Sequence, residues 1–212
     1  MVAKTVENAT TLEPKAAHRL SARDRLLAAA DELFYAEGVH VVGIDRIVER
    51  AGVAKASLYD IFGSKDELVR AYLEKHFRKR QERIARVLAA NKTPRDRILG
   101  VFGEIEGSLA GSEFRGCRFI SAAAESRPGD ASEAVGEAYR SWLRSLFNDL
   151  AKAAGARDAK QLGRQLSLLY DGAAVAGRMD KDRAGAAKGV HSAVVALLDA
   201  AIPSKLSSRR AR

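Results

Sequence analysis

Four side chains between residues 55 and 65 have the types and spacing that favour contact with DNA. Lys55 and Tyr59 stand four residues apart, so they share one face of a helix, and Ser57 lies between them. A tyrosine hydroxyl can bond a phosphate or a base edge, and a serine hydroxyl both donates and accepts hydrogen bonds. Lys65 stands at the expected start of a further helix, where its ammonium group and the free helix amides would hold a phosphate. These residues predict a helix that lies against a nucleic acid.

Two short helical patterns joined by a glycine turn would position these side chains. The patterns run over Ile44–Ala51 and Lys55–Phe62, and Gly52 stands where the first helix must end, because glycine adopts the left-handed conformation at little steric cost. Apolar residues recur at helical spacing in both patterns: Ile44, Ile47, Val48 and Ala51 in the first, and Leu58, Ile61 and Phe62 in the second. A helix, a tight turn and a second helix form the outline of a helix-turn-helix, whose second helix can lie in the major groove.

A preceding helix completes a small N-terminal domain. It is expected to begin at Ser21, whose hydroxyl can accept a hydrogen bond from a free amide of the first turn, and to end at Gly38. Its apolar stripe consists of Leu26, Leu27, Ala30, Leu33 and Phe34. A long helix follows, with apolar residues at helical spacing from Leu68 to Leu88. We therefore expect three helices around a shared core, followed by a longer helical segment.

The segment Ser21–Leu73 resembles the DNA-binding domain of the tetracycline-repressor (TetR) family of bacterial regulators. The resemblance rests on AADELFYAEG (Ala29–Gly38), IVERAGVAK (Ile47–Lys55), the pair Leu58 and Tyr59, Phe62, and SKDEL (Ser64–Leu68). Farther along, RGCRFISAAAE (Arg115–Glu125) looks like the sixth helix of many members. The resemblance implies an all-α protein with an N-terminal three-helix helix-turn-helix domain and a C-terminal helical ligand-binding and dimerisation domain. It also implies a dimeric regulator, typically a repressor that a small apolar or amphipathic effector releases from a palindromic operator.

The resemblance places the DNA contacts around the second and third helices. The candidate residues are Val42, Gly43, Arg46, Lys55, Ala56, Ser57, Tyr59, Asp60 and Lys65. Val42 and Gly43 stand where members often carry Thr or Ser, and Ala54 replaces a Ser that would cap the recognition helix. Asp60 stands where a polar or basic residue is common. An acid there repels phosphate, although it can accept a hydrogen bond from a cytosine amine.

The rest of the chain contains five further helical patterns. They cover Pro94–Leu109, Phe114–Glu125, Ala131–Ala154, Ala159–Met179 and Ala184–Ile202. The first of them begins with Thr93 as a cap and proline at the first helical position. We expect a flexible arm over 1–20, the DNA-binding domain over 21–66, an effector-binding and dimerisation domain over 67–202 and a basic tail over 203–212.

Small residues gather in the last two helical patterns, over Gly172–Gly177 and Ala184–Gly189. Small side chains let helices approach closely, either within one chain or between two chains. In the resembling family the last two helices pair across a two-fold axis, so the resemblance implies a homodimer through residues about 160–202. Ordinary packing inside one chain is the alternative.

Aromatic residues and the cysteine are the candidates for an effector pocket. They are Phe102, Phe114, Cys117, Phe119, Tyr139, Trp142, Phe147 and Tyr170. Aromatic residues at helical spacing are also typical of a plain core. Cys117 has Arg115 and Arg118 close by in the sequence, and because cations lower a thiol pKa it could sense redox state. A small buried apolar residue is the alternative for Cys117.

The net charge of +9 is unevenly distributed. Residues 22–66 carry six Lys and Arg against eight Asp and Glu, whereas residues 67–97 carry ten against four. The tail adds Lys205, Arg209, Arg210 and Arg212. The basic excess thus lies outside the predicted reading helix, and a basic run on a long helix is typically a solvated face. A sequence-independent protein that binds nucleic acid or an anionic surface through this excess is the alternative function.

Several classes of protein fit this sequence poorly. No stretch of about 18 apolar residues occurs and the N-terminus lacks an apolar signal core, so we expect no membrane span and a cytoplasmic protein. One cysteine excludes an internal disulfide. No phosphate-binding glycine loop occurs, and the histidines His18, His40, His76 and His191 have no metal-binding spacing. We expect no metal, no cofactor and no enzyme, a small helical enzyme being a remote alternative, and we expect His76 to be a core histidine.

Overall fold

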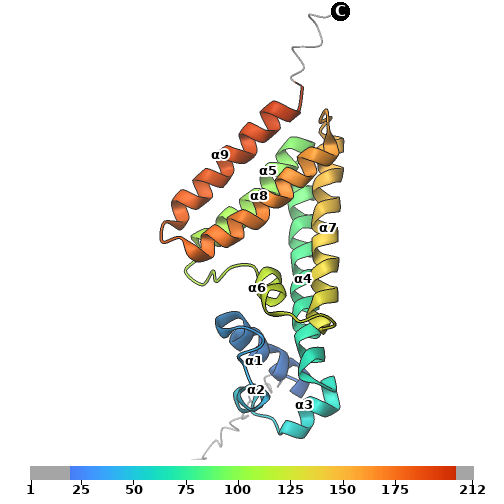
Figure 1. Cartoon of the computed structure of the whole chain (residues 1–212), viewed down its shortest axis with the longest axis vertical. Helices are drawn as coiled ribbons and strands as arrows, with labels where there is room; N and C mark the ends of the chain where they lie inside the picture. The colour runs from blue at the N-terminus through green and yellow to red at the C-terminus, as the bar shows by residue number, and fades with distance from the viewer. Residues whose placement is uncertain (1–19, 204–212) are drawn as a thin grey trace, which may run out of the picture.

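The computed structural model describes residues 20–203, and α-helices account for most of them (Figure 1). The helices are α1 (Ala22–Glu37), α2 (Ile44–Ala51), α3 (Lys55–Phe62), α4 (Lys65–Ala90), α5 (Pro94–Ala110), α6 (Arg118–Glu125), α7 (Ala131–Ala153), α8 (Ala159–Met179) and α9 (Arg183–Ala201). The all-α prediction is confirmed, since residues 20–203 contain no strand. None of the described helices is long and apolar enough to cross a membrane. Except for Leu20 and Pro203, the predicted arm and basic tail lie outside the described residues.

Helices α1–α3 pack around a small core at one end of the molecule, and we call residues 21–66 the head (Figure 1). Ile47 on α2 and Leu58 on α3 are fully buried, and burial of each such side chain contributes roughly 2 kcal/mol. The predicted caps are confirmed. The Ser21 hydroxyl accepts a hydrogen bond from the N–H of Asp24 at 3.1 Å, and Gly52 ends α2 in the left-handed conformation, with φ 61°. Both α2 and α3 begin and end where the sequence predicts.

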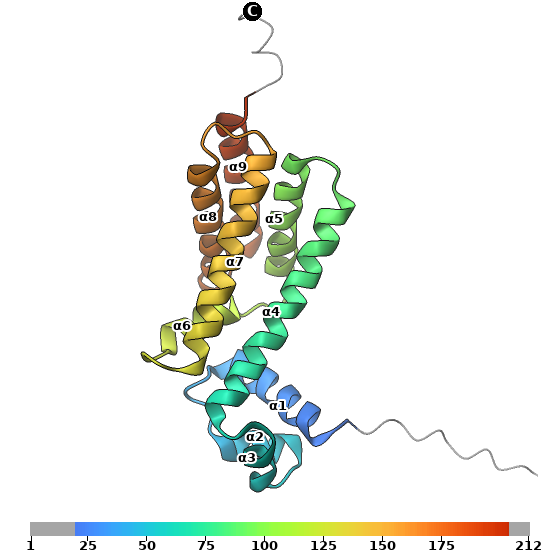
Figure 2. The ribbon, with the colours of Figure 1, turned by 90° about the vertical axis from the view of Figure 1, so that its right-hand side faces the viewer.

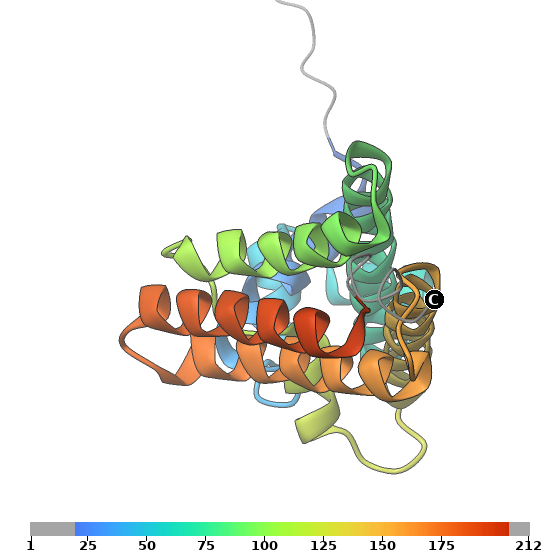
Figure 3. The ribbon, with the colours of Figure 1, turned by 90° about the horizontal axis from the view of Figure 1, so that it is seen from above.

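The long helix α4 joins the head to the rest of the bundle (Figure 2). The hydroxyl of Ser64 caps its first turn by accepting a hydrogen bond from the N–H of Glu67 at 3.1 Å. Toward its start α4 packs against α1, and farther along it runs beside α7. Helices α8 and α9 lie side by side on one flank of the bundle, with α5 next to α9 (Figure 3). One continuous helix therefore connects the head with the predicted effector domain.

Helix α6 begins at Arg118, four residues after the predicted start at Phe114. The cause is a contact with α1 that the local pattern does not contain. The hydroxyl of Tyr35 accepts a hydrogen bond from the N–H of Arg115 at 2.8 Å and donates one to the carbonyl of Gly116 at 3.3 Å. Gly116 adopts φ +99°, which L side chains rarely adopt, so the helix cannot extend back through it.

The small residues of α8 and α9 divide between the interior and the surface. At Gly177 an added Cβ would lie 1.9 Å from Cδ2 of Leu109 on α5, so this glycine serves packing within the chain. At Gly172 and Gly189 an added Cβ would meet no atom within 4 Å. Ala173 and Ala174 are buried with Gly177, while Gly172 and Gly189 are exposed. Packing within the chain thus accounts for Gly177, and the homodimer alternative stays a prediction for the exposed Gly172 and Gly189.

Candidate DNA interface and effector cavity

The outer face of α3 brings most of the predicted contact residues together. Lys55, Ala56, Tyr59 and Asp60 are exposed, and Ser57 is partly buried. Tyr59 contributes a large aromatic side chain to this face, and 44% of the residue's area is accessible. Leu58 on the inner face anchors the helix in the head. The arrangement can present a ring, a hydroxyl, a cation and a carboxylate to one groove of a duplex.

Val42, a candidate for DNA contact, is fully buried in the core of the head and exposes no surface to a duplex in this arrangement. Its neighbour Val41 is 72% exposed. Two adjacent valines point to opposite sides here, and the sequence offers no local signal that distinguishes them. Gly43 is exposed at the N-cap of α2 and provides no side-chain hydrogen bond, as predicted. Val41 therefore replaces Val42 as the apolar candidate beside the DNA-facing helices.

Carboxylates in the head already bind the predicted cations. The guanidinium of Arg46 makes two hydrogen bonds to Glu37, at 2.5 and 2.8 Å. The Lys55 ammonium lies 2.8 Å from a carboxylate oxygen of Asp45, and this hydrogen bond raises the pKa of Lys55. Both pairs lie on the surface, where such ion pairs are weak. On binding DNA, phosphates would replace these carboxylates as partners of the two cations.

Lys65 is less available to a phosphate than its sequence position suggests. It occupies the first position of α4, and its ammonium donates a hydrogen bond to the carbonyl of His40 at 3.3 Å. Burial lowers the pKa of Lys65, while the nearby charges of Asp66 and Glu125 act in the opposite direction. A phosphate contact by Lys65 stays a prediction; the hydrogen bond to His40 uses one of the three N–H donors of the ammonium group and leaves two for such a contact.

The basic excess along α4 does not form one free cationic surface. Arg70, Arg78 and Arg83 lie 3.3, 3.9 and 3.6 Å from Glu67, Glu74 and Glu104 respectively. Arg80 instead turns toward the interior of the bundle, where it binds Tyr170. This distribution argues against the alternative of a sequence-independent anionic-surface protein that acts through α4.

Asp60→Asn is expected to change the preferred base at one position of each half-site. The reason is that the carboxylate of Asp60 is exposed on α3, where it can accept a hydrogen bond from a cytosine amine, and such base contacts discriminate by about 1–3 kcal/mol. A selection from randomised duplexes, carried out on both proteins, measures the preference. Asp149→Asn, an exposed change on α7, controls for the lost charge. Tighter binding to every sequence would show instead that Asp60 only repels phosphate.

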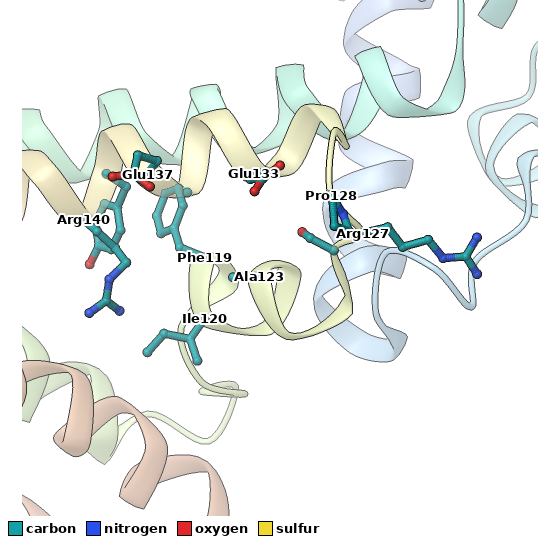
Figure 4. Close-up of a pocket in the computed structure, with 11 residues that line it drawn as sticks. Phe119, Ile120, Ala123, Arg127, Pro128, Glu133, Glu137 and Arg140 are labelled. Carbon is teal, nitrogen blue, oxygen red and sulfur yellow. The ribbon is translucent and has the colours of Figure 1, made fainter.

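A cavity of about 340 Å³ lies between α6 and α7 (Figure 4). Phe119, Ile120 and Ala123 of α6 form one wall, and α7 contributes Tyr139 and charged side chains at the rim. A second cavity of about 290 Å³ lies on the other side of α6, toward α8, and Cys117 lines it. Ile120 belongs to both cavities. Helix α6 therefore separates two hollows of a size that small ligands can occupy.

The eight predicted effector residues have different environments. Phe119 and Tyr139 line the first cavity and stack with ring centroids 4.0 Å apart. Phe102 and Phe147 are fully buried, and their ring centroids lie 5.5 Å apart. The ring centroid of Tyr170 lies 5.7 Å from that of Phe102 and 5.8 Å from that of Phe147. Phe102 and Phe147 are therefore ordinary core residues, which was the alternative for them. Phe114 packs beside Gly177, and Trp142 packs on Phe77 at 5.6 Å.

Sequence reasoning missed an interior polar contact, the hydrogen bond from the guanidinium of Arg80 on α4 to the hydroxyl of Tyr170 on α8. A signal was present, because Arg80 lies three residues after Phe77 and four before Ile84, in the apolar stripe of α4. The same helix carries His76, whose Nε2 lies 2.8 Å from a carboxylate oxygen of Asp31 on α1. His76 is thus a satisfied interior histidine, as predicted. Within residues 20–203 no three His, Cys, Asp or Glu side chains cluster as metal ligands would.

Comparison with known proteins agrees with this geometry. Residues 26–72 match the model of the family described as bacterial regulatory proteins, tetR family. The activator FasR of Mycolicibacterium smegmatis is 50% identical over 54 residues, which cover 26% of this chain and 25% of FasR. The repressor NemR of Escherichia coli K12 is 32% identical over 81 residues, which cover 38% of this chain and 41% of NemR. The chain thus matches well under two thirds of either relative.

A solved structure extends the likeness to the C-terminal helices. SCO4454, a TetR-family transcriptional regulator from Streptomyces coelicolor, superposes with a TM-score of 0.82 at 33% sequence identity. The match covers 86% of this chain and 96% of SCO4454. With an exposed recognition helix in the head and a likeness that spans both domains, the chain belongs to the TetR family of DNA-binding transcriptional regulators, which are not enzymes.

Proposed function

We propose that the protein is a homodimeric repressor that leaves a palindromic operator when a small effector binds beside α6. One observation carries the ligand response: α6 is fastened to the head at both of its ends, while its other faces line the two cavities. A ligand that moves α6 would therefore move the head. The names of FasR and NemR describe opposite effects on transcription, so the sign of regulation is a separate part of the proposal with its own test.

The N-terminal end of α6 is held by α1. The guanidinium of Arg118 lies 3.5 Å from the ring centroid of Tyr35 and 3.6 Å from a carboxylate oxygen of Asp31. The hydroxyl of Tyr35 also binds the backbone of the preceding loop at Arg115 and Gly116. A cation over an aromatic face contributes up to about 2 kcal/mol when it is desolvated. This end of α6 and α1 therefore move together.

The C-terminal end of α6 is held by the loop between α1 and α2. A carboxylate oxygen of Glu125 accepts a hydrogen bond from the N–H of His40 at 2.9 Å. The imidazole of His40 lies 3.7 Å from the carboxylate of Asp130, just before α7. An added Cβ at Gly38 would lie 2.6 Å from Glu125, so only glycine permits this approach without a shift. The loop that leads into α2 is thus attached to α6 and would move with it.

A ligand acts on this arrangement through its differential affinity for two positions of α6. If it binds the position that suits DNA less well, the population of release-competent dimers rises, and DNA weakens ligand binding by the same factor. A coupling of about 1–3 kcal/mol corresponds to a change of roughly 5- to 150-fold in operator affinity.

An exposed stripe on α8 and α9 supports the homodimer. Its α8 part consists of Arg164, Leu168, Gly172, Val175 and Met179, and its α9 part of Gly185, Gly189, Ser192, Ala196 and Ala200. Leu168 and Met179 expose 63% and 75% of their surfaces. Val190 and Val194 of α9 are buried within the chain and do not belong to this stripe. Large apolar side chains beside small ones on paired helices suit a four-helix contact with a second copy.

Selection from randomised duplexes with the full chain tests this function. We expect a two-fold symmetric site whose half-site centres lie about 34–36 Å apart, or at a spacing that DNA bending accommodates. Tyr59→Phe should bind the selected site roughly 5- to 30-fold more weakly if its hydroxyl is bonded there, since such a bond is worth about 1–2 kcal/mol. Enrichment of no sequence, or of one half-site alone, would contradict the proposal.

A genome-wide map of bound sites, combined with transcript levels, tests the sign of regulation. Transcripts beside the bound sites should rise when the protein is removed. A fall in those transcripts would identify an activator and refute repression while leaving DNA binding intact.

A further inference from the structure

A groove of about 370 Å³ lies between α7 and α8, toward the end of the bundle that is remote from α3 (Figure 1). Its four charged members are all basic, two from each helix: Arg140, Arg144, Lys160 and Arg164. The helices pack closely beneath these side chains, because an added Cβ at Gly163 would lie 2.9 Å from the backbone of Asn148. This contact fixes the floor of the groove, while the four cations are exposed on its walls.

Like charges meet in the groove on both helices. Arg140 and Arg144 stand four residues apart on α7, a spacing at which like charges share a face and destabilise the helix. Lys160 and Arg164 repeat this spacing on α8. Lys160 is also the second residue of α8, where the helix dipole disfavours a cation. An arrangement that is unfavourable in the chain alone becomes favourable when an anion lies among the four side chains.

The two arginines of α7 differ in how closely a carboxylate holds them. Arg140 lies 3.0 Å from Asp171 of α8. Arg144 lies 3.9 Å from Glu137, whose side chain is 79% exposed. An exposed pair at that separation contributes little, so Arg144 is available to another anion.

The two cations of α8 have no carboxylate partner in the described part of the chain. Among residues 20–203, no carboxylate oxygen lies within 4.0 Å of Lys160 or Arg164. Asp158 precedes α8 directly, but its side chain caps the helix by accepting a hydrogen bond from the N–H of Gln161 at 2.9 Å. Three of the four charges in the groove therefore lack a close partner.

A solvated basic face is the usual explanation for exposed arginines and lysines on one helix. It does not account for this groove, because the cations come from two helices and converge on one hollow. No described Asp or Glu side chain lines that hollow. Its volume lies within the usual range for ligand sites, roughly 300–1,000 Å³.

The groove adjoins the two regions on which the proposed function depends. Arg140 also lines the cavity between α6 and α7 (Figure 4). Arg164 and Leu168 belong to the exposed stripe on α8. A ligand in the groove would therefore lie between the wall of the effector cavity and the edge of the proposed dimer contact.

We infer that this groove is a second ligand site, which binds a phosphate or diphosphate group of a small molecule. Arginine forms paired, charge-assisted hydrogen bonds with phosphate oxygens, and lysine binds phosphate as a point charge. Several cations around one hollow suit an anion with more than one negative charge better than a monocarboxylate. Ser145 and Asn148 also line the groove and supply neutral donors for the remaining oxygens. The site is distinct from the α6 cavity, so this inference goes beyond the proposed function and does not depend on it.

Calorimetric titration of the full chain with pyrophosphate, at constant ionic strength, tests the inference. We expect one pyrophosphate per chain, bound about tenfold or more tightly than acetate. The double variant Arg144→Gln/Lys160→Gln should bind pyrophosphate about 10- to 100-fold more weakly, since each contact is worth about 3- to 10-fold at an exposed site. Neither residue belongs to the stripe on α8, so the oligomeric state should not change. Lys79→Gln/Arg86→Gln removes two exposed cations of α4 as the matched control and should stay within about twofold of wild type.

Failure of pyrophosphate to bind at millimolar concentration would overturn the inference. An equal loss of affinity in the control variant would overturn it too, because the attraction would then come from the net charge of +9 and not from the groove. A short duplex without an operator is titrated in parallel. If the duplex and pyrophosphate lose affinity by the same factor in Arg144→Gln/Lys160→Gln, nucleic acid and not a small molecule occupies the groove.

The double variant should keep the helix content and Tm of the wild type. Both substitutions replace exposed side chains, and removing a cation from the first turn of α8 favours the helix. If the double variant fails to fold, Lys160→Gln alone decides the question, with an expected loss of about 3- to 10-fold in pyrophosphate affinity. Wild-type affinity in that single variant would then refute the site.

Discussion

Gly172→Arg is expected to convert the proposed dimer to a monomer and to abolish tight operator binding. The glycine is exposed in the middle of the α8 part of the stripe, and an added Cβ meets no atom of its own chain within 4 Å. The arginine therefore fits the isolated chain but places an unpaired charge between two copies, which is costly when buried. Because one head makes few base contacts, loss of the second head should weaken specific binding by several orders of magnitude.

Light scattering measures the oligomeric state of the variant, and an operator titration measures its affinity for DNA. Gly189→Arg, on the adjacent stretch of α9, should give the same result, since its surroundings are equally open. Gly103→Arg on α5 is the matched control, because Gly103 is also an exposed helical glycine with no atom near its added Cβ. It should remain a dimer with unchanged helix content. A wild-type monomer that binds its operator tightly would contradict both the dimer and the palindrome.

The parts of the fold that local chemistry determines could be predicted from the sequence. Gly52 ends α2 because only a left-handed residue turns the chain there, and Ser21 caps α1 through its own hydroxyl. The apolar periods then give the bounds of α2, α3 and α8. These elements depend on residues within a few positions of one another. The local sequence therefore contains the information that determines where these helices begin and end.

The features that the sequence did not predict depend on contacts between distant segments of the chain. The start of α6 is set by Tyr35, about eighty positions earlier in the chain, and its hydrogen bonds leave no trace in the local period. The choice between Val41 and Val42 is made by the packing of the head and not by residue type. Arg80 was visible as a basic residue in an apolar stripe, but its partner Tyr170 is ninety positions away.

Asp31→Asn is expected to lower the free energy of unfolding by roughly 2 kcal/mol at pH 7. The Asp31 carboxylate on α1 binds His76 at 2.8 Å, Lys75 at 3.3 Å and Arg118 at 3.6 Å, so it joins α1 to both α4 and α6. Burial by itself raises the pKa of Asp31, but the hydrogen bond from His76 and the nearby cations outweigh it and lower the pKa from 3.8 to about 2. Because each pKa unit corresponds to about 1.4 kcal/mol, this lowering of the Asp31 pKa accounts for the expected loss of roughly 2 kcal/mol in the free energy of unfolding.

The pH dependence follows from the sign of this change. Because the pKa is lower in the folded protein than in the unfolded chain, the stabilisation is complete above about pH 5 and is lost as the pH falls through 3.8 toward 2. Urea titrations from pH 7 to pH 3 should therefore show a constant difference between wild type and Asp31→Asn down to about pH 5, and roughly half of that difference at pH 3. Glu32→Gln is the matched control: Glu32 is the next residue of α1, and its pair with Arg50 is more than half exposed on both sides. That surface pair should contribute at most about 1 kcal/mol. Equal losses in the two variants would mean that apolar packing, not this carboxylate, holds the head against α4 and α6.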